Sequence, residues 1–303
     1  MNKKVIIIGC GNVGMSYAYA LLNQRTYVNE LALIDLNQER VQGEVMDLNH
    51  CLAFSPSKMK IKVGSYSDCL DADLIVIAAG VNQAPGESRL DLLKRNAAIF
   101  KSIITEVMDN GFDGVFLIAT NPVDIMTYLT QKYSKLPKFR VIGSGTTLDT
   151  ARLRFLIGDR IKVSPTNVHG YVIGEHGDSE FIPWSDVVIA LQPASDFLSA
   201  KAMNEITEEV KSAAQKIIAA KGATYYGIGM CLVRITNAIL GDENAVMVVS
   251  TYDKTNDVYV GLPSVISKDG AARKIDFRLN EEETAKLMNS INILKNAINE
   301  LGE

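Results

Sequence analysis

The chain has 303 residues, which is enough for about two domains with a sizeable buried core. Hydrophobic residues make up 47% of it, charged residues 22%, and the formal net charge is −4. This mildly acidic balance argues against nucleic-acid binding, which needs clustered Lys and Arg. No stretch approaches the roughly 20 apolar residues of a membrane span, so no membrane association is expected.

The first half of the chain alternates short β-branched runs with helical patterns. Strands are predicted at residues 5–8, 31–34, 60–63, 74–78, 115–118 and 140–142. Helices are predicted near residues 12–23, 38–51, 90–110 and 122–133. The strands are apolar on both faces, as in a parallel sheet covered by helices. This order of elements predicts an α/β, doubly wound parallel (Rossmann) sheet.

The pattern changes after about residue 142. Alternating segments at residues 169–173, 246–252 and 258–266 predict antiparallel strands, and helices are predicted at 199–220, 223–240 and 281–301. No repeat, low-complexity tract or flexible linker separates the two halves. We therefore expect two closely packed domains, a Rossmann domain at residues 1–143 and an α+β domain with antiparallel strands at 144–303.

The N-terminus and the cysteines bear on location. Lys3 and Lys4 precede an apolar-looking stretch that resembles a signal peptide, but glycines interrupt the apolar run after four residues. The cysteines are scattered and form no C-x-x-C pair: Cys10, Cys51, Cys69 and Cys231. We read them as reduced thiols of a cytoplasmic protein.

A glycine-rich turn follows the first predicted strand and opens a helix. It reads Gly9-Cys10-Gly11-Asn12-Val13-Gly14. Its glycines permit a tight turn and a close approach of the backbone to a pyrophosphate, while the helix N-terminus supplies amide donors. Alone, a GxGxxG pattern is weak evidence, since glycine turns are common. Its position between strand and helix strengthens the prediction of a dinucleotide site.

Asp35 ends the second predicted strand, 21 positions after Gly14. A carboxylate there can bind the adenosine ribose hydroxyls and would repel a 2′-phosphate, and no Arg follows it immediately. The alternative is a helix cap after a strand. We predict NAD, rather than NADP, as the cofactor of residues 1–143.

Four segments with reactive or polar side chains follow. They are residues 82–89 (NQAPGESR), 120–122 (TNP), 148–152 (LDTAR) and 174–178 (GEHGD). In sequence and in order along nearly the whole chain, they resemble the L-lactate/malate dehydrogenase family, and within it the bacterial L-lactate dehydrogenases. The resemblance implies NAD-dependent reduction of a 2-oxo acid, with residues 144–303 as the catalytic domain that binds substrate.

The chemistry of these side chains agrees with that function. Asp149 and Arg152 are three apart on a predicted helix and share one face. Arg152 can hold a carboxylate with two parallel hydrogen bonds. Asp149 can accept from one nitrogen of His176 and favour its protonated form, so that His176 acts as a general acid or base. Singly, each has a plainer reading as an ion pair, a helix cap or a solvated turn residue.

Further roles come from the resemblance. Residues 82–89 would form a lid over the site, and Arg89 in it would polarise the substrate carbonyl when the lid closes. Asn121 would hold the substrate oxygen, Gly80 and Asn121 would contact the cofactor, and Thr224 would form part of the substrate pocket. Their plainer readings are a solvated arginine, a turn residue before proline and a helix-start threonine. No metal site is expected.

Gln83 bears on the choice of substrate. A malate dehydrogenase of this family has arginine at that position, where it binds the second carboxylate of oxaloacetate. A neutral Gln83 would leave that carboxylate unpaired, so we expect pyruvate and L-lactate as substrates. The alternatives are malate or a broader range of 2-hydroxy acids. In a different class, the chain would be a non-catalytic NAD-binding protein, a reading that predicts damage at the reactive positions, and His176, Asp149, Arg152 and Arg89 are all present.

Arg154 and His169 match positions that bind fructose 1,6-bisphosphate in the allosteric bacterial enzymes. Arg154 lies two positions after Arg152, so on a helix it points roughly 200° away from it. A solvated Arg and an ordinary His are the alternative. A bisphosphate site of this kind would imply a homotetramer, because the phosphates need basic groups from two chains.

Overall fold

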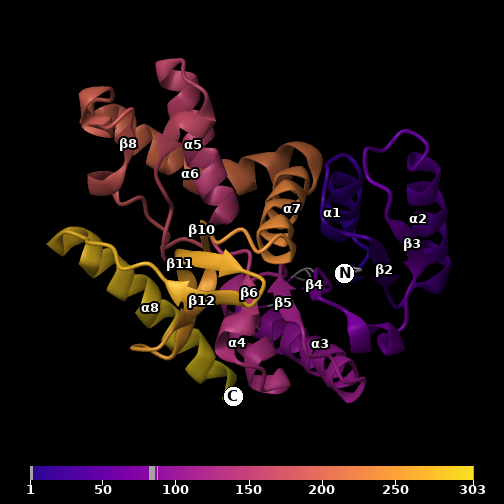
Figure 1. Cartoon of the computed structure of the whole chain (residues 1–303). Coiled ribbons are helices and arrows are strands. Elements are labelled where there is room, and N and C mark those ends of the chain that lie inside the picture. The colour runs from indigo at the N-terminus through magenta and orange to yellow at the C-terminus, as the bar shows by residue number, and fades with distance from the viewer. Residues whose placement is uncertain (1–2, 82–85, 87, 303) are drawn as a thin grey trace.

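The computed structural model describes residues 3–81, 86 and 88–302, apart from the side chain of Arg89. A sheet of nine strands runs through the molecule in the order β12-β11-β10-β6-β5-β4-β1-β2-β3 (Figure 1). Six of these strands are parallel: β1 (Lys4–Ile8), β2 (Glu30–Ile34), β3 (Lys60–Val63), β4 (Leu74–Ile77), β5 (Val115–Ile118) and β6 (Val141–Gly143). Their order, 3-2-1-4-5-6, is that of the dinucleotide-binding doubly wound sheet.

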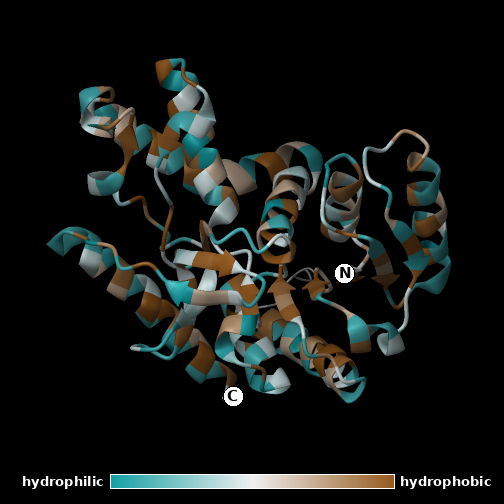
Figure 2. Cartoon of the chain, viewed as in Figure 1, coloured by the Kyte–Doolittle hydropathy of each residue, from teal (hydrophilic) through white to brown (hydrophobic). Residues whose placement is uncertain are grey.

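Alternate residues of the parallel strands enter two separate cores. On one face, Val5 and Ile7 of β1 pack with residues of α1 (Asn12–Leu22), α2 (Gln38–Cys51) and α7 (Tyr226–Leu240). On the other face, Ile6 and Ile8 pack with residues of α3 (Arg89–Asp109), α4 (Val123–Ser134) and α8 (Glu281–Leu301). Figure 2 shows apolar residues concentrated along the strands and on the helix surfaces that face them.

Three antiparallel strands extend the same sheet into the C-terminal half. They are β10 (Ala245–Asp253), β11 (Val258–Ser267) and β12 (Gly270–Lys274). Strand β10 joins the parallel part through the antiparallel pairing of Ser250 with Gly143. A Cβ on Gly143 would lie 2.8 Å from the Ser250 Cβ, so only glycine allows the two strands to approach this closely.

A smaller lobe holds the rest of the C-terminal half, at the upper left of Figure 1. Its elements are α5 (Thr147–Ile161), α6 (Ala200–Lys221) and a three-stranded sheet of β7 (Val168–His169), β8 (Val188–Ile189) and β9 (Gln192–Pro193). Short 3-10 turns occur at Tyr66–Asp71, Lys138–Arg140, Pro165–Asn167, Trp184–Asp186 and Ala194–Asp196. Leu153 and Ile157 of α5 pack against β8 and α6 in a third core.

The predicted fold class is confirmed, and each of the six predicted parallel strands forms within one residue of its expected bounds. Two later predictions are partly wrong. The strand expected at 169–173 is only Val168–His169, followed by an isolated bridge between Ile173 and Phe181. The helix expected at 223–240 begins at Tyr226, because Gly222 ends α6 with a left-handed backbone (φ 85°) and Tyr225 is not helical (φ −153°).

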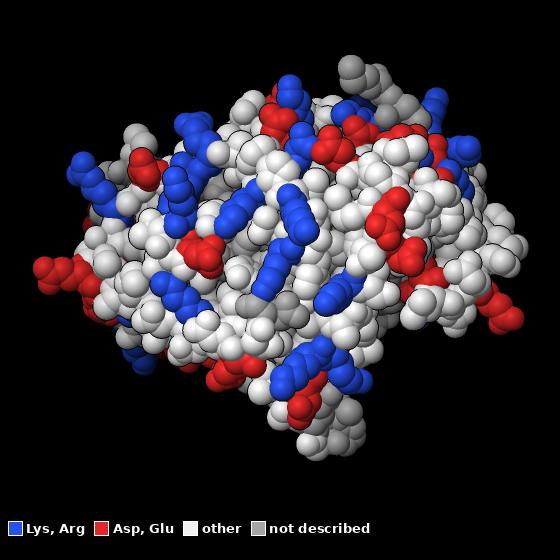
Figure 3. All heavy atoms as spheres, turned by 90° about the horizontal axis from the view of Figure 1, so that it is seen from below, with Lys and Arg blue, Asp and Glu red and all other residues white. Residues whose placement is uncertain are grey.

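The helices, the cysteines and the surface charges complete the description of the fold. None of the helices in the described ranges is long and apolar enough to cross a membrane. All four cysteines are free thiols. Charges of both signs occupy the face seen from below, with several basic side chains across its centre (Figure 3).

Candidate active site

The glycine-rich turn between β1 and α1 is shaped by close backbone contacts. Gly9 has a φ of 102°, and a Cβ there would lie 2.4 Å from the amide nitrogen of Ala79. A Cβ on Gly14 would lie 2.0 Å from the Gly9 carbonyl oxygen. Gly11, by contrast, has open space where a Cβ would project. The first and third glycines therefore set the packing of turn and helix, and the second leaves room for a ligand.

The Asp35 carboxylate is held by two backbone amides at the end of β2. Its Oδ2 accepts from the Cys10 amide at 2.7 Å and its Oδ1 from the Asn37 amide at 3.0 Å. Asn37 also caps α2, because its side chain accepts from the Arg40 amide at 3.0 Å. The residue that caps α2 is therefore Asn37 and not Asp35, contrary to the alternative reading of Asp35 as a helix cap.

A cleft of about 710 Å³ opens where the carboxyl ends of β1, β2 and β4 meet. It is lined by Gly9, Gly11, Asp35 and Gly80, among others. This is the edge at which the strand order reverses, where doubly wound sheets bind ligands. Four of the predicted cofactor residues thus meet in one cleft. Asn12 borders a neighbouring cavity, and Val13 packs partly against the core.

Asp149, Arg152 and His176 come together at the start of α5. The His176 Nδ1 lies 2.7 Å from Oδ2 of Asp149, whose side chain is 1% exposed. The other Asp149 oxygen accepts from Arg152 Nη1 at 2.7 Å. Asp149 and Arg152 share the helix face expected from their spacing, and the loop 174–178 carries the imidazole to them. The structure therefore links an acid–base group and a guanidinium through one carboxylate.

The charges of this group determine its protonation. Burial opposes the charged imidazolium, but the Asp149 carboxylate beside it raises the pKa of His176 well above its ordinary value. Burial likewise opposes the charged form of Asp149, yet the neighbouring His176 and Arg152 lower the pKa of that carboxyl group. His176 is therefore protonated and Asp149 ionised at neutral pH, the pairing that a general acid requires.

The loop that carries His176 is anchored from two sides. The His176 amide donates to Oδ2 of Asp124 at 2.8 Å, and Ser250 Oγ donates to Oδ1 of the same carboxylate at 2.5 Å. Gly174, with a φ of 99°, pairs with Gly261 of β11 through two 3.0 Å backbone hydrogen bonds. The backbone of this loop is thus held by α4 and by both long antiparallel strands.

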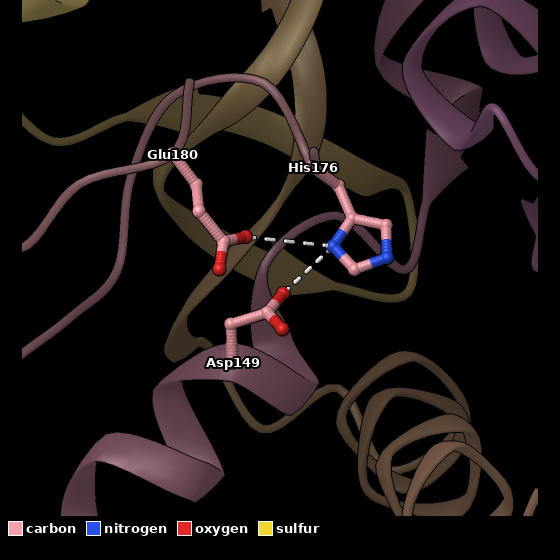
Figure 4. Close-up of side chains that lie close together, drawn as sticks. All are labelled: Asp149, His176 and Glu180. Carbon is pink, nitrogen blue, oxygen red and sulfur yellow. Dashed lines mark hydrogen bonds and ion pairs between the residues drawn. The ribbon is translucent and has the colours of Figure 1, made fainter. Parts of the chain in front are cut away.

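Two functional candidates were not predicted from the sequence. Asp124 is 2% exposed and Glu180 is 4% exposed. Burial raises the pKa of Asp124 to about 6 and that of Glu180 to about 7. Glu180 Oε2 lies 3.7 Å from His176 Nδ1 (Figure 4). The available signals were their positions, Asp124 three residues after Asn121 and Glu180 four after His176.

The other described residues that were predicted to bind substrate are not among those that meet at Asp149. Asn121 is exposed at the carboxyl end of β5 and precedes a cis peptide bond to Pro122. Thr224 is half-buried between α6 and α7. Gln83 lies outside the described residues, and so does the side chain of Arg89, whose backbone begins α3.

Arg154 and His169 lie away from the acid–base group. The Arg154 Nε donates to the Gly170 carbonyl oxygen at 3.2 Å, and its guanidinium lies 5.2 Å from the Tyr171 ring centroid. His169 is exposed on β7. Arg154 also lines a cavity of about 400 Å³ between α5, α7 and β10. Arg154 thus contacts Gly170 and Tyr171 rather than Asp149. This agrees with its position two residues after Arg152, which turns it away from the face that Asp149 and Arg152 share.

Two family models together match almost the whole chain. The model described as "lactate/malate dehydrogenase, NAD binding domain" matches residues 3–143. The model described as "lactate/malate dehydrogenase, alpha/beta C-terminal domain" matches residues 146–303.

Individual relatives agree. The chain is 52% identical to an L-lactate dehydrogenase of Halalkalibacterium halodurans, over 97% of this chain and 96% of the relative. It is 51% identical to L-lactate dehydrogenase 2 of Bacillus cereus strain ZK / E33L, with the same coverage. Among solved structures, a lactate dehydrogenase from a Medee basin deep-sea metagenome library superposes with a TM-score of 0.98 at 48% identity, covering 100% of this chain and 99% of that one. The minor L-lactate dehydrogenase of Enterococcus mundtii in its ligands-bound form gives 0.96 at 45% identity, covering 98% of both chains.

Proposed function

The chain belongs to the lactate/malate dehydrogenase family, and on that premise we propose how its residues carry out the reaction. It catalyses the NAD-dependent interconversion of pyruvate and L-lactate, the activity for which its relatives are named. One observation supports the assignment of roles most strongly. The Asp149 carboxylate pairs at 2.7 Å with both His176 and Arg152, which couples a proton donor to a binding group for a carboxylate.

His176 is the general acid and base. Its Nδ1–H donates to Asp149, so its Nε2 is the atom that gives a proton to the ketone oxygen of pyruvate and removes one from the hydroxyl of lactate. Asp149 fixes this tautomer and stabilises the imidazolium, as the raised pKa of His176 indicates.

Arg152 binds the substrate carboxylate. Its guanidinium carries five N–H donors in a planar fork, and the contact with Asp149 engages Nη1. The remaining donors can hold a carboxylate in two parallel hydrogen bonds. This places the substrate's oxo group within reach of the imidazole on the same side of α5.

The cofactor NAD fits the glycine cradle, because the open space at Gly11 would be filled by any side chain there. Gly9, Gly11, Asn12, Val13 and Gly14 would hold the pyrophosphate, and Asp35 the adenosine ribose, with Gly80 and Asn121 beside the nicotinamide half. When bound, NADH supplies the hydride. Because Asp35 is held by two amides, its charge stays directed at the ribose position and disfavours NADP.

The choice of substrate depends on the segment 82–89. By resemblance, Gln83 would lie over the distal carbon of the substrate, Arg89 would polarise the carbonyl, and Asn121 and Thr224 would complete the pocket. A neutral Gln83 favours pyruvate over oxaloacetate, whose second carboxylate would be buried without a partner.

Assembly and regulation follow the resemblance as well. Residues 1–143 form the NAD-binding domain and residues 144–303 the catalytic domain of a cytoplasmic homotetramer that acts in fermentation after glycolysis. Exposed apolar side chains support self-association, notably Tyr19 at 56%, Tyr226 at 69% and Met230 at 54% exposure around one shared cavity. Arg154 and His169 would bind fructose 1,6-bisphosphate at a subunit interface.

A spectrophotometric NADH assay tests the proposed function. It compares pyruvate, oxaloacetate and 2-oxoisocaproate, each with and without fructose 1,6-bisphosphate. We expect the highest kcat/KM with pyruvate. A higher value with oxaloacetate would support malate dehydrogenase, and NADH binding without turnover of any substrate would support a non-catalytic protein.

A further inference from the structure

Glu180 is a second buried carboxyl group beside the catalytic imidazole. Its Oε2 lies 3.7 Å from His176 Nδ1, while Asp149 Oδ2 lies 2.7 Å from the same nitrogen. Figure 4 shows the two carboxyl groups approaching that nitrogen from different directions, Asp149 from α5 and Glu180 from the loop that carries His176. One ring nitrogen of His176 and one carboxylate oxygen from each of the two acids all lie within 4.8 Å of one another.

The charges around this group nearly cancel. From α5, Asp149 and Arg152 contribute one charge of each sign, joined at 2.7 Å. With Glu180 ionised and His176 protonated, the four groups sum to zero. With Glu180 protonated, they sum to +1, which the carboxylate of the substrate on Arg152 would neutralise. The free site is therefore neutral when Glu180 is ionised, and the substrate-bound site is neutral when Glu180 is protonated.

Other nearby acids are engaged elsewhere. Asp124 of α4 accepts from the His176 amide and from Ser250, so it holds the backbone of the loop rather than the ring. Glu175, on the same loop, accepts from Ser179 Oγ. Strand β11 contributes the uncharged Gly261. Glu180 is thus the acid other than Asp149 that faces the ring nitrogen.

We propose that Glu180 is a positioning residue that sets how tightly His176 holds its proton. When Glu180 is ionised, two carboxylates face the imidazolium and retain its proton. When Glu180 is protonated, its own proton having come from solvent, Asp149 alone opposes release of the proton from His176. The proposal rests on the proposed function, in which His176 gives its proton to the substrate.

The electrostatics of the site support this. Burial, followed by the effects of His176 and Asp149, places the pKa of Glu180 at about 7, so its charge changes near neutral pH. Burial opposes the charged form of His176, but Asp149 and then Glu180 raise the pKa of the imidazole well above its ordinary value. His176 therefore loses its proton at a pH at which Glu180 is already ionised, against the attraction of both carboxylates.

Glu180→Gln removes one of these charges and keeps the size of the side chain. We expect the pH at which His176 loses its proton to fall by about one unit. Pyruvate reduction needs protonated His176, so its kcat/KM would decline at a lower pH than in the wild type. Lactate oxidation needs neutral His176, so it would become faster, up to about tenfold, between the pH at which Glu180 ionises and the pH at which wild-type His176 loses its proton. A merely structural role would slow both directions and could not accelerate one.

Matched controls separate charge from position. Glu175→Gln removes a carboxylate from the same loop, and both pH profiles should keep their midpoints. Glu180→Asp retains an ionisable group at a greater distance, and its midpoints should fall between those of the wild type and Glu180→Gln. Unchanged midpoints in Glu180→Gln, in an enzyme that still reduces pyruvate, would overturn the proposal.

A titration by NMR gives a readout that needs no turnover and no substitution of Glu180. The chain has three histidines, so the ring signals of His176 can be assigned by their absence from His176→Gln. In the wild-type enzyme we expect two inflections, one near pH 7 from Glu180 and one at higher pH from His176 itself. A single inflection would overturn the proposal. Two inflections in a protein that reduces no 2-oxo acid would instead contradict the proposed function alone.

Discussion

Asp124 is a single buried carboxylate that joins three separate segments of the chain. It lies on α4 and accepts from the His176 amide of the loop 174–178 and from Ser250 of β10. We expect Asp124→Ala to lower the free energy of unfolding by about 2–4 kcal/mol, because one buried and one partly buried donor lose their acceptor. Ser250→Ala should cost about 1 kcal/mol. Urea unfolding of both variants and of the double variant measures their coupling, and strictly additive losses would show that the hydroxyl and the carboxylate do not act together.

Gln83 ties one residue to the identity of the substrate. Gln83→Arg would put a charge opposite the second carboxylate of oxaloacetate and an unpaired charge opposite the methyl of pyruvate. The ratio of kcat/KM for oxaloacetate to that for pyruvate should rise at least about a hundredfold, roughly 2.7 kcal/mol. Arg152→Lys is the control and should impair both substrates by removing their shared contact. An unchanged ratio in a folded Gln83→Arg enzyme would mean that Gln83 does not lie over the distal carbon.

The three candidate residues that meet at the start of α5 could be predicted from the sequence, whereas the two buried acids that surround them could not. Asp149, Arg152 and His176 stand in short motifs whose spacing and chemistry are visible in the sequence. Asp124 and Glu180 act through contacts between segments, and a carboxylate in a helix or a loop resembles any solvated acid until its burial is known. Long-range packing, which the sequence pattern does not contain, decides their roles.

The contact between the glycine turn and α1 requires the absence of a side chain at Gly14. A Cβ on Gly14 would meet the Gly9 carbonyl at 2.0 Å, whereas Gly43, exposed within α2, has open space. We expect Gly14→Ala to weaken NADH binding at least about tenfold and to lower the melting temperature, because the turn must shift. Gly43→Ala should instead stabilise the protein by about 0.5–1 kcal/mol. Equal effects of the two substitutions, in NADH titration and thermal unfolding, would contradict this account.

The bounds of elements with a clear hydrophobic pattern were predicted accurately, whereas the bounds of elements with a weak pattern were not. The strands of the parallel sheet are apolar runs between turn residues, and they form within one residue of their expected bounds. Of the strand expected at 169–173, only His169 pairs with β8, because the loop that carries His176 turns away to reach Asp149 and β11. The start of α7 was misplaced by three residues, since the αL conformation of Gly222 was not anticipated.

The ion pair between His176 and Asp149 makes the stability of the whole molecule depend on pH. The folded-state pKa of His176 is raised. Its contribution to the free energy of unfolding is therefore complete below the unfolded pKa of about 6.5 and is lost as pH rises through the folded pKa. The pKa of Asp149 is lowered, so its contribution is complete above about 3.9 and is lost as pH falls through the folded value. The difference in unfolding free energy between wild type and His176→Gln should be largest between about pH 4 and 6.5. Denaturant unfolding across pH 3–10 measures it, and a difference that grew steadily above pH 7 would have the wrong sign.

The molecule brings its two halves together at the carboxyl ends of its parallel strands, the glycine cleft after β1 and β4 and the acid–base group beyond β5 and β6. We propose that His176 supplies the proton there. Turnover of pyruvate by His176→Ala, compared with wild type at equal NADH saturation, tests it most directly. We expect turnover to fall by at least about a hundredfold while the affinity for NADH is unchanged, because general acids contribute typically 10²–10⁴-fold. A variant that binds NADH normally and keeps more than about a tenth of wild-type turnover would contradict the claim.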